Sequence, residues 1–77
     1  MKTLVLGASG QIGAYTVQDL VEFYKAEVIA TSRKLVNVKK AMMDLRLVNR
    51  VKVMELDAAN TAEVAKLAKA ERVDTIV

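Results

Sequence analysis

The chain has 77 residues, which suits one small domain, because independent domains usually run from about 50 to 250 residues. Apolar residues make up 53% and charged residues 27% of it, which excludes a disordered acidic tail. Cysteine and histidine are absent, so we expect no disulfide framework, no cysteine-based zinc site and no histidine general base. No apolar run approaches the roughly 20 residues of a membrane span. Without a secretory signal either, the expectation is a cytoplasmic protein with no membrane partner.

The net charge of +3 is spread unevenly. Residues 33–52 hold seven of the twelve lysines and arginines and a single acid, Asp44. A basic stretch can bind nucleic acid, but this one has no interleaved aromatic side chains on which bases could stack. A solvated helix face is the simpler interpretation, and nucleic acid ranks last among the partners considered.

Apolar spacing predicts strands and helices in alternation. Residues 2–6 form a short apolar strand that Gly7 ends. From Ile12 onward the period becomes helical, with an apolar stripe at Val17, Leu20, Val21 and Tyr24. Further strands are predicted at residues 27–31, 50–56 and 73–77, and further helices over 38–45, with a stop near Asn49, and from an Asn60 cap through Ala68.

This order predicts an α/β fold, a Rossmann-like three-layer arrangement with helices on both faces of a parallel four-stranded sheet. Parallel strands joined by right-handed helical crossovers give the strand order 3-2-1-4. The fourth strand would then be an uncovered apolar edge. We therefore expect residues 1–77 to be the amino-terminal part of an incomplete α/β domain. The rest of a larger enzyme, or a second copy of the chain, would cover that edge.

The strongest chemical signal is the run Gly-Ala-Ser-Gly-Gln-Ile-Gly over residues 7–13, between a predicted strand and a predicted helix. Gly7 would allow a tight turn, Gly10 a close approach of the backbone to a pyrophosphate, and Gly13 close packing of the helix on the sheet. The free N–H groups of the first helical turn attract phosphates, and Ser9 and the Gln11 N–H would add donors. A purely structural strand-to-helix turn is the alternative. A P-loop is excluded, because no Gly-Lys-Ser/Thr follows.

The end of the second predicted strand bears on the choice of cofactor. A site for NAD usually has an acid about 20 residues beyond the loop, which accepts from the ribose 2′-hydroxyl. Here the residues are Thr31, Ser32, Arg33 and Lys34, with no acid. Arg33 can hold a 2′-phosphate and Ser32 can donate to it, so the pattern favours NADP over NAD. Alternatively, Arg33 and Lys34 simply begin a solvated helix.

Asp57 and Ala58 follow the third predicted strand. At the carboxyl edge of a parallel sheet, Asp57 could accept from the adenine amino group while the Ala58 N–H donates to the ring. Asp57 could equally cap the turn into the third helix. The sequence leaves both roles open.

These residues resemble the amino-terminal NAD(P)-binding portion of saccharopine dehydrogenase-like proteins and, nearly as well, that of extended short-chain dehydrogenase/reductases. Residues 2–10 look like the opening of both families. Residues 16–20 and 53–58 look more like the saccharopine group, whereas residues 11–13 and 72–77 look more like the short-chain enzymes. The resemblance implies cofactor contacts at Gly7, Ser9, Gly10, Gln11, Ile12, Ser32, Arg33, Asp57 and Ala58.

Catalytic residues are not expected in this chain. Short-chain enzymes use a Tyr-x-x-x-Lys pair, and neither Tyr15 nor Tyr24 has a lysine four residues later. The leading hypothesis is therefore the NADP(H)-binding portion of an NAD(P)-dependent oxidoreductase, with the catalytic and substrate parts outside the chain. The alternatives are a non-catalytic module that senses NADP(H), and a structural α/β scaffold without a working site.

Overall fold

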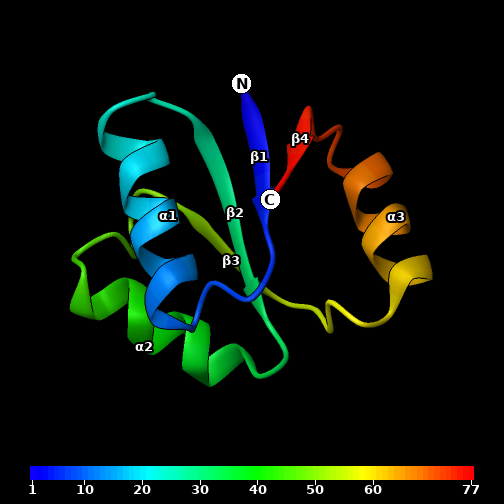
Figure 1. Cartoon of the computed structure of the whole chain (residues 1–77), viewed down its shortest axis with the longest axis horizontal. Helices are drawn as coiled ribbons and strands as arrows, with labels where there is room; N and C mark the ends of the chain where they lie inside the picture. The colour runs from blue at the N-terminus through cyan, green and yellow to red at the C-terminus, as the bar shows by residue number, and fades with distance from the viewer.

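Strands and helices alternate through the whole computed structural model, which describes residues 1–77. In chain order the elements are β1 (Lys2–Val5), α1 (Gln11–Glu22), β2 (Glu27–Ser32), α2 (Leu35–Asp44), β3 (Lys52–Glu55), α3 (Thr61–Ala70) and β4 (Thr75–Ile76). The four strands are parallel and lie in the order β3-β2-β1-β4. Helices α1 and α2 cover one face of the sheet and α3 covers the other (Figure 1). The predicted fold is confirmed.

The register brings the carboxyl ends of the strands to one edge. In the centre of the sheet, Leu4 of β1 lies opposite Ile29 of β2 and Ile76 of β4. Farther along, Ser32 at the end of β2 lies opposite Glu55 at the end of β3. The loops after β1, β2 and β3 therefore meet at the lower end of the molecule in Figure 1.

Two apolar clusters of unequal size lie on the two faces. Eleven buried residues on the α1 and α2 face form the larger cluster: Val5, Ala8, Ala14, Val17, Val21, Ala26, Val28, Ala30, Val38, Met42 and Leu47. On the α3 face, only Leu4, Ile29 and Leu56 are buried, and Val64, Leu67 and Ala68 of α3 pack against them while remaining partly exposed. In the stripe predicted for α1, Val17 and Val21 are thus buried and Leu20 is partly buried.

Two or three residues after the last residue of each helix, the chain has a basic residue in the left-handed conformation, where glycine is more usual. These residues are Lys25, Arg46 and Arg72, with φ values of 53°, 59° and 54°. A backbone hydrogen bond spans each of these positions. The Ala26 N–H donates to Leu20 O at 3.0 Å across a seven-residue turn, and the bonds Leu47 N to Met42 O at 2.7 Å and Val73 N to Ala68 O at 2.9 Å close six-residue turns. Tertiary burial of Leu47 fixes the second of these ends.

The element boundaries correct two expectations. Helix α1 ends at Glu22, so Tyr24 lies beyond it and is 71% exposed instead of completing the buried stripe. Helix α2 ends at Asp44, before the stop expected near Asn49. The predicted Asn60 cap is confirmed, because its side-chain oxygen accepts from the Glu63 N–H at 3.2 Å. None of the helices has the length and apolar character that crossing a membrane would require.

Candidate functional site

The loop between β1 and α1 is held against the end of β2. Gly7 adopts a φ of +64°, a left-handed conformation that favours glycine. The Ala8 N–H then donates to the carbonyl oxygen of Thr31 at 2.7 Å, and the Gly10 N–H donates to that of Gly7 at 3.3 Å. The turn expected at Gly7 is present, and it joins the loop to the strand that ends at Ser32.

The amino terminus of α1 is open to a ligand. Its N-cap, Gly10, has no side chain to bond the first turn, and that turn holds no acid. The N–H groups of Gln11, Ile12 and Gly13 have no hydrogen-bond partner within the protein. Three free donors and the positive end of the helix dipole converge there, which is the arrangement that binds phosphate. The Ile12 side chain itself is 83% exposed.

Gly10 and Gly13 differ in what a side chain would meet. A Cβ on Gly13 would collide with the Gly7 carbonyl oxygen and lie 3.1 Å from the Cα of Ala8. A Cβ on Gly10 would make only an ordinary contact of 3.6 Å with the same oxygen. Gly13 is therefore required by packing, as its expected role implies. The fold itself would tolerate a methyl group at Gly10, so packing within the chain does not require glycine there.

A hollow of about 310 Å³ lies at the carboxyl edge of the sheet and joins the predicted positions from three separate loops. It is lined by Gly7, Ser9, Ser32, Arg33, Leu56, Asp57 and Ala58. Six of these seven were expected from the sequence; Leu56 was not, although it ends an apolar strand. Gly10, Gln11, Ile12 and Gly13 are not part of the lining and belong to the adjoining start of α1.

The side chains of Ser32 and Arg33, which both line this hollow, differ in burial and in hydrogen bonding. The Ser32 side chain is buried, and its hydroxyl donates to the Lys34 carbonyl oxygen at 2.6 Å. That bond shapes the turn into α2 and occupies the hydroxyl that was expected to donate to a ligand. The Arg33 side chain is exposed and makes no hydrogen bond or ion pair, so its guanidinium is available.

Asp57 acts as a cap in this structure. Its Oδ1 accepts from the Ala59 N–H at 2.9 Å, and its carbonyl oxygen accepts from the Asn60 N–H at 3.0 Å. The Ala58 N–H and Asp57 Oδ2 have no partner. The capping role is thus present, and two residues that line the hollow, Asp57 and Ala58, each keep one polar atom without a partner.

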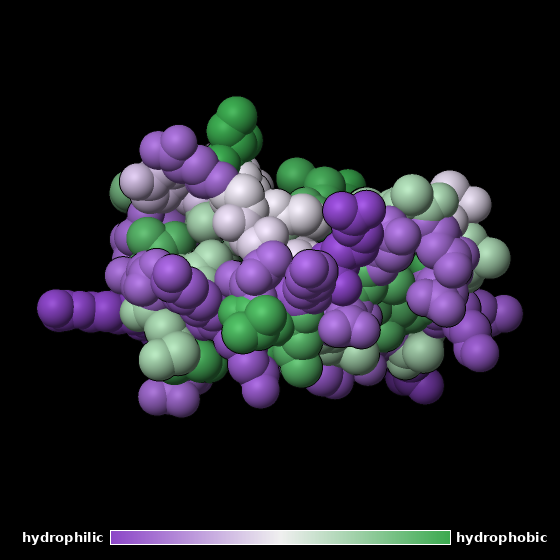
Figure 2. Space-filling model, turned by 90° about the horizontal axis from the view of Figure 1, so that it is seen from below, coloured by the Kyte–Doolittle hydropathy of each residue, from purple (hydrophilic) through white to green (hydrophobic).

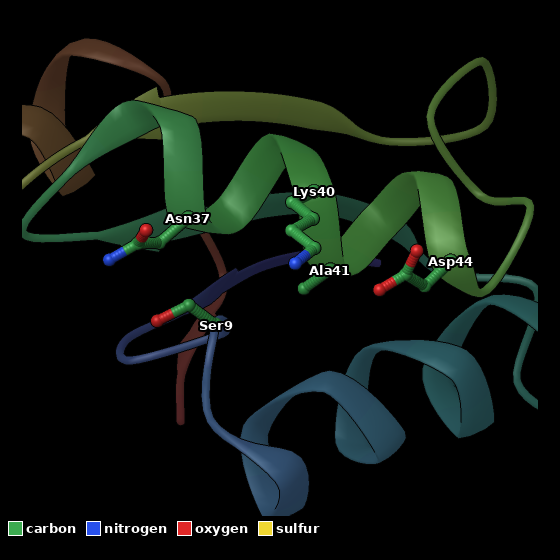
Figure 3. A pocket seen from close by; sticks show the side chains of 5 residues that line it. All are labelled: Ser9, Asn37, Lys40, Ala41 and Asp44. Atoms are coloured by element: carbon green, nitrogen blue, oxygen red, sulfur yellow. The ribbon is translucent and has the colours of Figure 1, made fainter.

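A second hollow of about 320 Å³ lies between the glycine loop and α2. It is lined by Ser9, Asn37, Lys40, Ala41 and Asp44. Figure 3 shows Asn37, Lys40 and Asp44 on the side of α2 that faces the loop and α1. Ser9 lines both hollows. Sequence reasoning treated Lys40 as part of a solvated face; the spacing of Asn37, Lys40 and Asp44 on one helical face was the signal that could have found this hollow.

Figure 2 shows this end of the molecule as a mixture of hydrophilic side chains, a pale patch of intermediate hydropathy and smaller hydrophobic groups. The free N–H groups, the unpaired Arg33 guanidinium and Lys40 bring positive charge to the two hollows. Each hollow also has one aspartate in its lining, Asp57 in the first and Asp44 in the second.

Comparison with known proteins agrees with this geometry. Residues 3–77 match the model of the NAD dependent epimerase/dehydratase family, which lies within the extended short-chain superfamily. No curated protein sequence gives a significant match. Of the two resemblances, the extended short-chain one is therefore supported, and the saccharopine dehydrogenase one is not.

Solved structures share the fold. UDP-glucuronic acid 4-epimerase from Bacillus cereus, in complex with UDP-glucuronic acid and NAD, matches 100% of this chain with a TM-score of 0.71 and 26% identity. The same enzyme in complex with NAD gives a TM-score of 0.70 at 26% identity over 99% of the chain. The PbgP3 protein from Burkholderia pseudomallei matches 97% of the chain with a TM-score of 0.66 and 21% identity. The chain spans about a quarter of these proteins, covering 25%, 26% and 23% of their lengths.

Proposed function

The chain belongs to the NAD dependent epimerase/dehydratase family, and on that premise we propose that it binds the adenosine and pyrophosphate half of a nicotinamide dinucleotide. The observation that carries the proposal is the open start of α1, where the N–H groups of Gln11, Ile12 and Gly13 are unpartnered beside a loop whose Gly10 leaves room for a ligand. The pyrophosphate would lie on these donors. The adenosine would extend into the hollow between Arg33 and Asp57.

NADP is the preferred dinucleotide in this proposal. Arg33 is free of ion pairs at the end of β2, and Lys40 lines the adjoining hollow beside Ser9. The unpaired Arg33 favours a 2′-phosphate, which carries about −1.5 to −2 charges at neutral pH, and Lys40 adds a positive charge in the adjoining hollow, which Asp44 also lines. The NAD present in the Bacillus cereus epimerase crystals supports the class of ligand but not this preference.

Within a longer protein, the chain would supply the cofactor-binding part of an NAD(P)-dependent oxidoreductase. The nicotinamide ring carries the hydride when the cofactor is bound. The role of these 77 residues is to bind and orient the adenosine end, and residues elsewhere would complete the site and hold the substrate.

Calorimetric titration of the folded chain with NADP⁺, NAD⁺, 2′,5′-ADP and ADP tests the proposal. We expect NADP⁺ and 2′,5′-ADP to bind more tightly than their partners without the 2′-phosphate. Arg33→Ala should weaken the phosphorylated pair about tenfold, the cost of a lost charged hydrogen bond, and leave NAD⁺ and ADP nearly unchanged. Arg50→Ala removes an exposed arginine that does not line either hollow and is the matched control.

Two outcomes would contradict parts of the proposal. Tighter binding of NAD⁺ than of NADP⁺ would overturn the cofactor preference and leave dinucleotide binding intact. Failure of every nucleotide to bind a chain that is folded by circular dichroism would reject the function and favour a structural scaffold.

A further inference from the structure

Glu55 places a carboxylate beside the turn that leads from β2 into α2. It is the last residue of β3 and lies opposite Ser32 in the sheet register. Its Oε2 accepts from the Leu35 N–H at 3.2 Å, at the first residue of α2. Glu55 therefore reaches the amino terminus of α2, although it lies 20 residues away from Leu35 in the sequence.

No local residue caps that helix start. Lys34 is the N-cap and makes no side-chain hydrogen bond, and the first turn of α2 contains no acid. The carboxylate that compensates the free N–H comes from the neighbouring strand. Arg33, which lies between Ser32 and Lys34, is not paired with it, since no salt bridge joins Arg33 to any acid. Arg33 and the Glu55 carboxylate thus both belong to the turn from β2 into α2, with no salt bridge between them.

We infer that Glu55 is a specificity residue that weakens binding of a 2′-phosphate at the Arg33 turn while leaving the unphosphorylated adenosine unaffected. The inference rests on the proposed function, because it concerns the same turn. Repulsion between two unit charges several ångströms apart in water amounts to less than about 1 kcal/mol, and the multiple charge of the phosphate enlarges it. Arg33 and Glu55 then act in opposition, and NADP is preferred over NAD by less than Arg33 alone would give.

The variant Glu55→Gln separates charge from structure. Glutamine keeps the length of the side chain and a carbonyl oxygen that can accept from the Leu35 N–H, so α2 should begin at the same residue. Glu63→Gln is the matched control. Glu63 lies on the first turn of α3 and, like Glu55, lines a third hollow between β3 and α3. Because α2 and α3 cover opposite faces of the sheet, the control removes a nearby negative charge without changing the turn into α2.

The experiment is a calorimetric titration of the wild-type chain and both variants with 2′,5′-ADP and with ADP. We expect Glu55→Gln to tighten 2′,5′-ADP binding about three- to tenfold, from removal of one repelling charge, with ADP binding unchanged. The gain should shrink at high salt, where such interactions are screened. It should persist in an Arg33→Ala background, because the carboxylate acts on the phosphate directly.

Other results would overturn the inference. An equal change for both nucleotides would mean that Glu55 only shapes the turn, and no change for either would mean that its charge does not reach the ligand. A similar gain in Glu63→Gln would assign the effect to overall charge. If wild-type chain that is folded binds ADP and 2′,5′-ADP but Glu55→Gln leaves their ratio unaltered, only this inference fails. If neither nucleotide binds, the proposed function fails and the inference falls with it.

Discussion

The two faces of the sheet differ in how many apolar side chains they bury. On the α1 and α2 face, eleven residues are buried in one cluster, and Val17, Val38 and Met42 are completely inaccessible to solvent. On the α3 face, three residues are buried, all of them from the sheet or the end of β3, and α3 contributes none. The glycine loop and the start of α1 join the better packed face, whereas Asp57 and Ala58 lie in the connection to α3.

This difference in burial predicts which face of the sheet contributes more to stability. Burial of apolar surface stabilises by about 25 cal/mol per Å², so most of the stability should come from the α1 and α2 face. Its rigidity also holds the unpartnered N–H groups of α1 in place. The α3 face contributes less, and opening there would disturb Asp57 and Ala58, on the adenine side of the proposed site, before the glycine loop.

The largest expected loss of stability is at Met42, on the better packed face. Met42→Ala removes a fully buried side chain from α2 and should cost about 2–5 kcal/mol, a large part of the roughly 4–12 kcal/mol expected for a domain of this size. Leu67→Ala, at a partly exposed position on α3, should cost about 1 kcal/mol. Urea unfolding followed by circular dichroism measures both. Equal losses would show that the two faces contribute alike.

Gly13→Ala should have the next largest effect. The added methyl group would collide with backbone atoms of Gly7 and Ala8, which cannot move aside as a side chain can, so α1 must shift at a cost of about 1–3 kcal/mol. Gly10→Ala adds the same methyl group in open contact and should leave the urea midpoint nearly unchanged. Comparing the two variants tests whether packing requires glycine at Gly13 but not at Gly10. A larger loss of stability in Gly10→Ala than in Gly13→Ala would contradict this expectation.

Thr3→Val, a substitution on the better packed face, should increase the stability of the folded chain. The Thr3 hydroxyl is buried and has no hydrogen-bond partner, and alternation along β1 puts it on the side of Val5. Replacing an unsatisfied buried hydroxyl with a methyl group of similar shape should stabilise the chain by about 1 kcal/mol. Thr31→Val is the contrasting variant, because the Thr31 hydroxyl donates to the Val5 carbonyl oxygen at 2.9 Å and its loss should destabilise. Thermal unfolding distinguishes the two signs.

The smallest effect concerns Glu71, which ties the end of α3 to the sheet. A hydrogen bond from Lys52, together with the nearby charges of Lys52 and Lys2, lowers the pKa of Glu71 below its usual value of 4.5. Because the folded pKa lies below the unfolded one, the contribution is present above the unfolded pKa and is lost as the pH falls through the folded pKa. Glu71→Gln should lower the melting temperature slightly at neutral pH. That difference should vanish in acid, and a difference independent of pH would contradict the assignment.

Sequence periodicity was sufficient for the order of elements and for the sheet, because each helix carries a local stripe and each strand a short apolar run. It failed at Tyr24 and near Asn49. Both errors have one cause: soon after each helix ends, the chain turns at Lys25 or Arg46, basic residues in the left-handed conformation, where glycine is the usual sequence signal. The ends are set by the return of the chain to the sheet, a tertiary effect.

Local sequence also determined the glycine loop, since the positive φ at Gly7 favours glycine and the close approach of α1 at Gly13 leaves no room for a side chain. The surroundings of that loop were decided by the tertiary structure. The bond from Glu55 to Leu35, the engagement of the Ser32 hydroxyl by Lys34 and the hollow beside Lys40 depend on strand register and on how α2 lies against the loop. Register and helix placement arise from burial of the whole apolar face, a property that no short stretch of residues contains.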